Sequence, residues 1–179
     1  MHNKPELSSA APILLTQASA ALAPAPLAAA AAPVDIEVSW AQHLDEVREA
    51  QRLRHQVFAS EMGAQLDGRL PGHDVDDFDD FCEHLLVRHS ASKQVIGTYR
   101  LLTPAQAKRA GRTYSDGEFD LSAIDALRPR MVELGRSCVH ADFRQGGVIM
   151  TLWGALARFL RRPLLAVMMC RASIHKRKN

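Results

Sequence analysis

The chain has 179 residues, of which 47% are hydrophobic and 23% are charged, and its formal net charge is +2. It is long enough for one globular domain with a substantial core. Neither sign of charge dominates, so nothing points to nucleic acid, and no stretch reaches the roughly 18 uninterrupted apolar residues of a membrane span. The three cysteines, Cys82, Cys138 and Cys170, are far apart and outside any CxxC spacing, which favours a reducing compartment such as the cytoplasm and argues against a metal site.

The two ends of the chain differ in composition from the middle. Residues 1–33 are rich in Ala, Pro and Ser and nearly uncharged, which predicts a disordered leader. A signal peptide is the weaker alternative, because Lys4 alone makes a poor basic front and prolines break the apolar stretch. Residues 34–170 are expected to form the folded domain and residues 171–179 a basic tail. Any membrane contact is expected to be peripheral.

A helical pattern runs from Ser39, a plausible N-cap, to about Glu61. Its apolar arc contains an arginine, Arg54, close to Val57 and Phe58. A guanidinium on the inward side of a helix is costly unless an anion meets it. Two interpretations remain open: Arg54 forms an ion pair with a downstream aspartate, or it helps to hold an anionic group of a substrate.

An acidic run follows a loop over residues 63–72, and it consists of Asp74, Asp76, Asp77, Asp79 and Asp80. The spacing does not fit the twelve-residue calcium loop, with its Gly at position six and its terminal Glu. One interpretation is a solvated acidic loop. The other is that two or three of these carboxylates receive the amino group of a substrate, with Arg54 as their internal partner.

Two β-rich runs, Leu85–Arg88 and Val95–Leu102, predict an antiparallel hairpin. Gly97 inside the second run indicates a bulge or a close backbone approach. With regular alternation, Arg100 would share a face with Ile96.

The segment after the hairpin is predicted to be mostly irregular. Residues 103–111 are interpreted as a polar connection. A turn then leads into a short helix that is capped near Asp120 or Ser122 and stopped by Pro129.

The next predicted strand begins at Met131 and carries Glu133, Gly135 and Arg136. A bulge at Gly135 would bring Glu133 and Arg136 to one side and leave a backbone amide unpaired. A carboxylate beside a free amide suits acyl transfer to an amine, because the amide stabilises an oxyanion and the carboxylate takes a proton. The alternative is a buried Glu133–Arg136 ion pair that only shapes the core. Cys138, His84 and His140 are interpreted as structural.

A turn with Arg144, Gly146 and Gly147 opens into a helix from about Val148 to Phe159. Amide groups at such a helix start favour a phosphate, although glycines are also common in ordinary strand-to-helix turns. The helix is expected to face a sheet with Ile149, Leu152, Trp153, Leu156 and Phe159 or Leu160. Residues 164–169 are a candidate strand beside the one that begins at Met131.

An ordered set of motifs between about Val38 and Leu160 resembles a known family. The motifs are HQVFASEMGAQ, DDFDDFCEHLLV, GTYRLL, YSDGEFDLS and VELGRSCVHADFR. The set is similar to the acyl carrier protein-dependent branch of the GCN5-related acyltransferase (GNAT) fold, which includes the acyl-homoserine-lactone synthases. Within that branch it looks most like the L-ornithine Nα-acyltransferases. The resemblance implies an α+β fold with a mixed α/β sheet.

The resemblance also implies a reaction and a set of site residues. A 3-hydroxyacyl group would pass from the phosphopantetheine arm of acyl carrier protein to the α-amino group of L-ornithine, giving lyso-ornithine lipid, with no bound cofactor or metal. The implied catalytic set is Glu133 as proton acceptor, the backbone at Gly135 as oxyanion donor, and Arg136. Arg144, Gly146 and Gly147 would hold the phosphopantetheine phosphate. The acceptor side would be shaped by Arg54, Phe58, Asp76, Asp79 and Arg100.

The family would continue past its fifth strand with another helix and more strands. The sequence is therefore expected to be a version truncated after that strand, with impaired activity. Two alternatives stay open: an acyl-homoserine-lactone synthase, and a non-catalytic fragment that binds acyl carrier protein.

Overall fold

A computed structural model of the chain describes residues 35–170, apart from 67, 145, 146, 162–164 and 166. The predicted leader, the predicted basic tail and Gly146 therefore lie outside the described residues.

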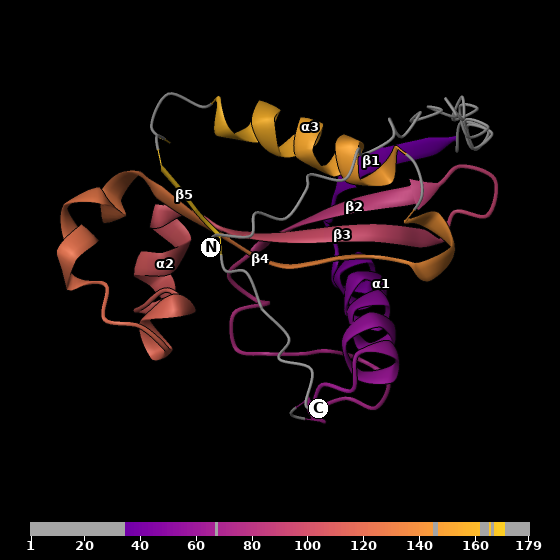
Figure 1. The fold of residues 1–179 in the computed structure, drawn as a ribbon, viewed down its shortest axis with the longest axis horizontal. Coiled ribbons are helices and arrows are strands. Elements are labelled where there is room, and N and C mark those ends of the chain that lie inside the picture. The colour runs from indigo at the N-terminus through magenta and orange to yellow at the C-terminus, as the bar shows by residue number, and fades with distance from the viewer. Residues whose placement is uncertain (1–34, 67, 145–146, 162–164, 166, 171–179) are drawn as a thin grey trace, which may run out of the picture. The chain divides into compact units, whose positions relative to one another are not determined.

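The core of the fold is a five-stranded sheet in the order β1-β2-β3-β4-β5 (Figure 1). The strands are β1 (Ile36–Trp40), β2 (Glu83–His89), β3 (Val95–Leu102), β4 (Met131–Val139) and β5 (Val167–Cys170). The first four pair antiparallel, and β5 pairs parallel to β4. The mixed sheet, the β2–β3 hairpin and the strand beside β4 confirm the predictions made from the sequence.

Helices cover the two faces of this sheet, with α1 (Leu44–His55) on one face and α3 (Val148–Leu160) on the other (Figure 1). The core on the α3 side joins that helix to alternate residues of β2, β3 and β4. A smaller cluster on the α1 side contains Ala50, Leu53, Val57, Leu86, Val95 and Cys138. Within the described ranges, none of the helices combines the length and apolarity needed to cross a membrane.

The buried stripe of α3 differs from the predicted one. Buried positions are Val148, Leu152, Ala155, Leu156 and Phe159. Ile149 and Trp153 are 43% and 44% exposed, so placing them on the inner stripe was wrong. Almost every position of this helix is apolar, so periodicity alone does not say which arc meets the sheet.

The first helix begins later than predicted. Ser39 is not an N-cap, because it lies in β1 opposite Leu86. The helix begins at Leu44, and Glu46 accepts hydrogen bonds from the backbone N–H of Gln42 (2.7 Å) and His43 (3.3 Å). After His55 the chain continues as a π-helix, η1 (Gln56–Glu61). Such widened turns often lie at functional sites.

Residues 103–111 are not a plain connection but contain the helix α2 (Pro104–Ala110). Thr103 caps its start in a reciprocal arrangement with Gln106, and Gly111 ends it in the left-handed conformation (φ 80°). These cap signals were present in the sequence but were not used. Two 3₁₀ helices follow, η2 (Ser115–Gly117) and η3 (Ser122–Arg130), and η3 runs one residue beyond Pro129.

A bulge in β3 decides which way Arg100 points. Val87 pairs with Gly97 whereas Arg88 pairs with Val95, so Ile96 is the extra, unpaired residue of a bulge in β3. Ile96 packs into the α3-side core, while Arg100 reaches aspartates on the other side. The predicted shared face was therefore wrong, because an extra residue breaks the alternation.

A second bulge lies in β4, one residue later than predicted. Thr98 pairs with Cys138 and Arg100 pairs with Gly135, so β4 has one extra residue between the two pairs. The positive φ falls on Arg136 (φ 50°) rather than on Gly135. That conformation is uncommon for a residue with a side chain, so contacts of the side chain must hold it. The bulge turns Arg136 toward the same face as Arg100.

We expect Gly97→Ala to destabilise the fold. A Cβ at this position would lie 2.9 Å from Cγ1 of Val148, a buried side chain that fixes α3 against the sheet. Overpacking of this kind costs about 1–3 kcal/mol of unfolding free energy. Urea unfolding would measure it, with Gly154→Ala as control because a Cβ there meets nothing within 4 Å. Equal unfolding free energies for the two variants would contradict the expectation.

Candidate active site

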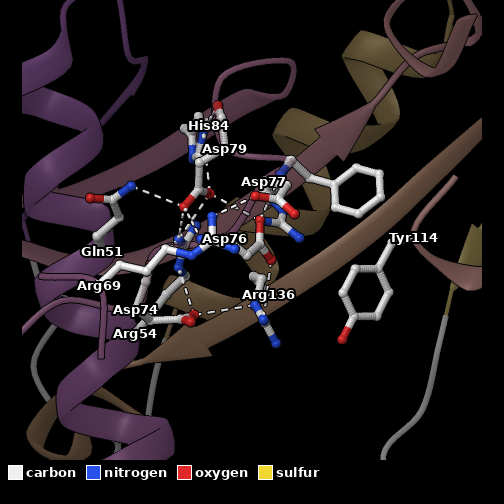
Figure 2. A network of polar contacts seen from close by, with 12 residues as sticks. Gln51, Arg54, Arg69, Asp74, Asp76, Asp77, Asp79, His84, Tyr114 and Arg136 are labelled. Carbon is white, nitrogen blue, oxygen red and sulfur yellow. Dashed lines mark hydrogen bonds and ion pairs between the residues drawn. The ribbon is translucent and has the colours of Figure 1, made fainter. Parts of the chain in front are cut away.

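Three arginines and three aspartates form a closed ring of ion pairs on the α1 side of the sheet (Figure 2). The arginines come from three different elements, α1, β3 and β4, and the aspartates from the loop before β2. In ring order the members are Arg136, Asp76, Arg100, Asp79, Arg54 and Asp74, and Asp74 closes back on Arg136. Each aspartate therefore bridges two arginines.

The distances around the ring are those of direct ion pairs. Arg54 Nη2 lies 2.8 Å from Asp79 Oδ2 and Arg100 Nη1 lies 2.9 Å from Asp79 Oδ1. Arg100 Nη1 and Arg136 Nη2 lie 2.6 and 3.1 Å from the two oxygens of Asp76. Asp74 Oδ2 lies 3.1 Å from Arg54 Nε and 3.2 Å from Arg136 Nε. The six formal charges sum to zero, so the ring needs no further ion to balance it.

Because the ring is largely buried, breaking one of its ion pairs costs unfolding free energy. The side chain of Arg54 is 1% exposed and that of Asp79 is 3% exposed. Burial alone would raise the pKa of Asp79, but the guanidinium of Arg54, followed by that of Arg100, holds it well below its ordinary value. Burial also opposes ionisation of Asp76, but the charge and hydrogen bond of Arg100, together with the charge of Arg136, lower its pKa on balance.

Neutral neighbours complete the coordination of Asp79. Gln51 Nε2 donates to Asp79 Oδ2 (2.9 Å), and Nε2 of His84 lies 3.0 Å from the backbone carbonyl of Asp79. Burial lowers the pKa of His84, so its imidazole is neutral and can donate to that carbonyl. His84 is thus structural, as predicted.

The ring settles two of the alternatives from the sequence. Asp74, Asp76 and Asp79 are not a solvated acidic loop, because they are ion-paired at low exposure; Asp77 and Asp80 remain exposed. Arg54 has aspartates on two sides and lies outside the lining of the neighbouring pocket. Arg54 and Asp79 lie outside the pocket lining and contact the ring members that line it.

A pocket of about 940 Å³ opens beside the ring. Ring members Asp74, Asp76, Arg100 and Arg136 form one wall. Other lining residues come from η1, the acidic loop, the segment after α2 and the end of β4, and among them are Phe58, Glu61, Arg69, Phe78, Arg112, Tyr114 and Arg144. The structure therefore brings Phe58, Asp76, Arg100, Arg136 and Arg144 of the predicted set to one space.

Glu133 lies next to this pocket rather than in its lining. Its carboxylate accepts hydrogen bonds from Tyr114 N (2.7 Å), Ser115 N (2.9 Å) and Ser115 Oγ (2.5 Å). Together with Gly135 it lines a small second cavity, and Phe78, Arg100 and Tyr114 line both spaces. The alternative of a direct Glu133–Arg136 ion pair is wrong, because each side chain has other partners.

The turn that holds Glu133 was not foreseen in the sequence. Asp116 accepts hydrogen bonds from the backbone N–H (2.7 Å) and hydroxyl (2.8 Å) of Thr113, and Arg128 grips it with two further bonds of 2.9 and 2.7 Å. These contacts fix Tyr114 and Ser115, between Thr113 and Asp116. The motif YSDGEFDLS was interpreted only as a turn, and its Asp116 was the available signal.

Arg144 lies at the other end of β4. Its Nε donates to the carbonyl of Val139 (3.0 Å), and its guanidinium pairs with Glu61 of η1. Gly147 is exposed and directly precedes Val148, the first residue of α3. Cys138 is buried, which raises the pKa of its thiol to about 12, so its assignment to the core is confirmed.

Comparison with known proteins identifies the family. The family described as acetyltransferase (GNAT) domain matches residues 53–154, and the chain belongs to this family. The α1-to-α3 region with its ring, its pocket and the bulged β4 lies almost entirely within the matched range.

Two proteins named L-ornithine N(alpha)-acyltransferase are similar in sequence. The one from Rhodobacter capsulatus is 37% identical over 155 residues, covering 82% of this chain and 59% of the relative. The one from Brucella abortus is 38% identical over 149 residues, covering 78% of this chain and 53% of the relative. The chain thus spans little more than half the length of these relatives.

Solved structures agree on the fold. FeeM, an N-acyl amino acid synthase from uncultured soil microbes, superposes with a TM-score of 0.59 at 11% identity, covering 76% of this chain and 70% of FeeM. The AHL synthase LasI gives a TM-score of 0.56 at 18% identity, covering 76% of this chain and 72% of LasI. These likenesses confirm the predicted acyltransferase fold.

We expect Asp79→Asn to lower the unfolding free energy by about 3–5 kcal/mol at pH 7, because it leaves two buried guanidinium groups without a shared anion. Because the pKa of Asp79 is lowered in the folded chain, its carboxylate stabilises the wild type at any pH above the ordinary carboxyl pKa. This stabilisation is lost progressively as the pH falls below about 4. The two proteins should therefore converge in acid.

Urea unfolding between pH 7 and pH 3 measures this convergence. The control is Asp80→Asn, an exposed neighbour in the same loop, which should stay within about 0.5 kcal/mol of the wild type. A gap between Asp79→Asn and the wild type that is the same at pH 7 and pH 3 would show that the charge of Asp79 is not what stabilises the ring.

Proposed function

We propose that this chain carries the acyl-transfer site of an L-ornithine Nα-acyltransferase. In this reaction a 3-hydroxyacyl group moves from the phosphopantetheine thioester of acyl carrier protein to the α-amino group of L-ornithine, giving lyso-ornithine lipid. The names of the relatives support the choice of acceptor. The observation that carries the proposal is the pocket of about 940 Å³ between Arg144 and the wall in front of Glu133.

The two ends of the pocket suit two different substrates. Arg144 lines the pocket and lies four residues before Val148, the first residue of α3. Amide groups at a helix start and the positive end of the helix dipole favour the phosphate of the donor arm. At the other end, Glu133 is the proposed proton acceptor, with Tyr114 and Phe78 separating it from the main space. A carboxylate with two oxygens has about four acceptor positions, so its three bonds leave room for one water that relays the proton.

The reaction needs no metal in this scheme. The amine nitrogen attacks the thioester carbon, the C–N bond forms, and the C–S bond breaks as the proton of the ammonium passes through Glu133 to the departing thiolate. A backbone amide near Gly135 is the proposed oxyanion donor. Among the described residues the β4–β5 ladder ends at Leu134 and Cys170, so Gly135 follows directly after the last paired position on that edge.

The ring has a supporting role in this proposal. Arg100, Arg136 and Asp76 form a pocket wall, and Arg54 and Asp79 hold that wall from behind. Phe58 adds an apolar surface on the η1 side. Both proposed substrates are soluble in water, so we place the reaction in the cytoplasm, with any membrane contact peripheral.

The proposal is tested by incubating the purified chain with labelled 3-hydroxyacyl carrier protein and either L-ornithine or S-adenosylmethionine. Mass spectrometry of lyso-ornithine lipid formed only with ornithine supports the proposal. Formation of an acyl-homoserine lactone from S-adenosylmethionine would overturn it in favour of the lactone synthases. Capture of acyl carrier protein without any product would instead favour a non-catalytic binding fragment.

Glu133→Gln is expected to lower kcat by about 10²-fold or more, because the amide cannot accept the proton. Thermal unfolding is measured alongside kcat, because a Gln side chain keeps the shape and one acceptor oxygen but turns its NH2 group toward a donor of Tyr114 or Ser115. The matched control is Glu37→Gln, an exposed carboxylate on β1. Unchanged kcat in Glu133→Gln would remove this residue from the mechanism.

Arg144→Ala is expected to raise KM for the acyl carrier protein about tenfold while KM for ornithine stays the same, because a phosphate contact to a charged donor is lost. Initial rates at varied concentrations of each substrate measure the two constants. Arg158→Ala, an exposed arginine on α3, serves as control. A selective rise in KM for ornithine would place Arg144 on the acceptor side instead.

A further inference from the structure

Five arginines line the large pocket, and four of them already have carboxylate partners. The pairs are Arg69 with Asp77, Arg100 with Asp76 and Asp79, Arg136 with Asp74 and Asp76, and Arg144 with Glu61. Arg112 is different. Within the described ranges no carboxylate lies at ion-pair distance from it, and its recorded contact is with the ring of Phe78, 5.0 Å from guanidinium carbon to ring centroid.

The cation–π contact with Phe78 does not use the hydrogen-bonding capacity of Arg112. A guanidinium carries its N–H donors in its own plane, so one that rests on an aromatic face keeps that planar fork for a carboxylate. Phe78 is a firm support, because it is 6% exposed and packs edge-on against Tyr114 at 5.6 Å. The charge of Arg112 also acts on Asp77, whose pKa is lowered chiefly by the hydrogen bond from Arg69.

The position of Arg112 associates it with the acceptor end of the pocket. It lies two residues before Tyr114, whose backbone N–H binds Glu133. Arg144 contacts Val139 at the far end of β4, and Glu133 and Val139 pair with β3 residues that are five positions apart, a span of roughly 17 Å. Two cationic groups at opposite ends suit two different anions.

We propose that Arg112 binds the α-carboxylate of the acceptor amino acid and so selects amino acids over simple amines. The inference rests on the proposed function for the identity of the acceptor, L-ornithine. In an α-amino acid the carboxylate and the amino group share one carbon, so a carboxylate held by Arg112 presents the amine beside the Phe78–Tyr114 wall and Glu133. The ring arginines cannot take this role without giving up their aspartates.

The test compares L-ornithine with 1,4-diaminobutane, which is ornithine without its carboxylate. Isothermal titration and steady-state kinetics are measured on the full chain, on Arg112→Gln and on Arg109→Gln. Arg109 is an exposed arginine on α2 outside the pocket lining and serves as the matched control. A second pair, L-norvaline and butylamine, gives the same comparison for a neutral side chain.

We expect the wild-type chain and Arg109→Gln to bind ornithine more tightly than the diamine. In Arg112→Gln, ornithine binding should weaken about ten- to a hundredfold, as for loss of a charge-assisted hydrogen bond, while diamine binding is unchanged. KM for the acyl carrier protein should not move. Arg112→Lys should recover part of the loss, because it restores the charge without the planar fork.

The outcomes separate this inference from the proposed function. If ornithine is acylated but Arg112→Gln binds it as well as the wild type does, the role of Arg112 is overturned and the function stands. If a selective rise in KM for the acyl carrier protein appears instead, Arg112 binds the donor phosphate and the inference is overturned. If ornithine is not acylated but norvaline binding still depends on Arg112, the function fails and the carboxylate site stands.

Discussion

Each aspartate of the ring bridges two arginines that come from different parts of the chain. Arg54 belongs to α1, Arg100 to β3 and Arg136 to β4, and the loop before β2 contributes all three aspartates. Removing one member leaves each of its two neighbours with one ion-pair partner instead of two at low solvent exposure, so loss of a single member is costly. This constraint ties the acidic loop to the sheet and gives the pocket a fixed wall.

The ring also depends on two irregularities of the sheet. The extra residue at Ile96 turns Arg100 away from the α3-side core, and the extra residue in β4 turns Arg136 toward Asp74 and Asp76. The positive φ of Arg136 is a strained conformation, and its ion pairs supply the free energy that maintains it. Bulges of this kind commonly re-aim side chains beside a functional site.

Charge is distributed in the pocket in a way that fits a transfer between two substrates. The ring is neutral as a whole, whereas Arg144 and Arg112 also line the space and are the two arginines that we propose to bind different substrates. Glu133 lies beside this space and is held by a turn that Asp116 and Arg128 stabilise. The segment after α2 therefore contributes both the support for the proposed base and the proposed contact to the acceptor carboxylate.

The sequence by itself determined the elements whose signals are local. β-rich runs located the β2–β3 hairpin, the apolar helix after Gly147 was placed within one residue, and the ordered motifs led to the GNAT family. It also showed that Arg54 could not be buried without an anion. The α2 helix was not predicted, although the sequence contains its cap signals, Thr103 and Gly111.

Only the tertiary structure decided which partners those residues have. A bulge shifts a strand by one residue and reverses the facing of every later side chain; Gly97 and Gly135 indicated that bulges could occur, but only the strand pairing shows that the extra residues lie at Ile96 and next to Arg136. The exposure of Trp153 on a mostly apolar helix, the three hydrogen-bond donors that contact Glu133 and the carboxylate partners of four of the five pocket-lining arginines likewise depend on how distant segments pack. Such contacts depend on where the chain brings charges together, and sequence spacing does not encode that distance.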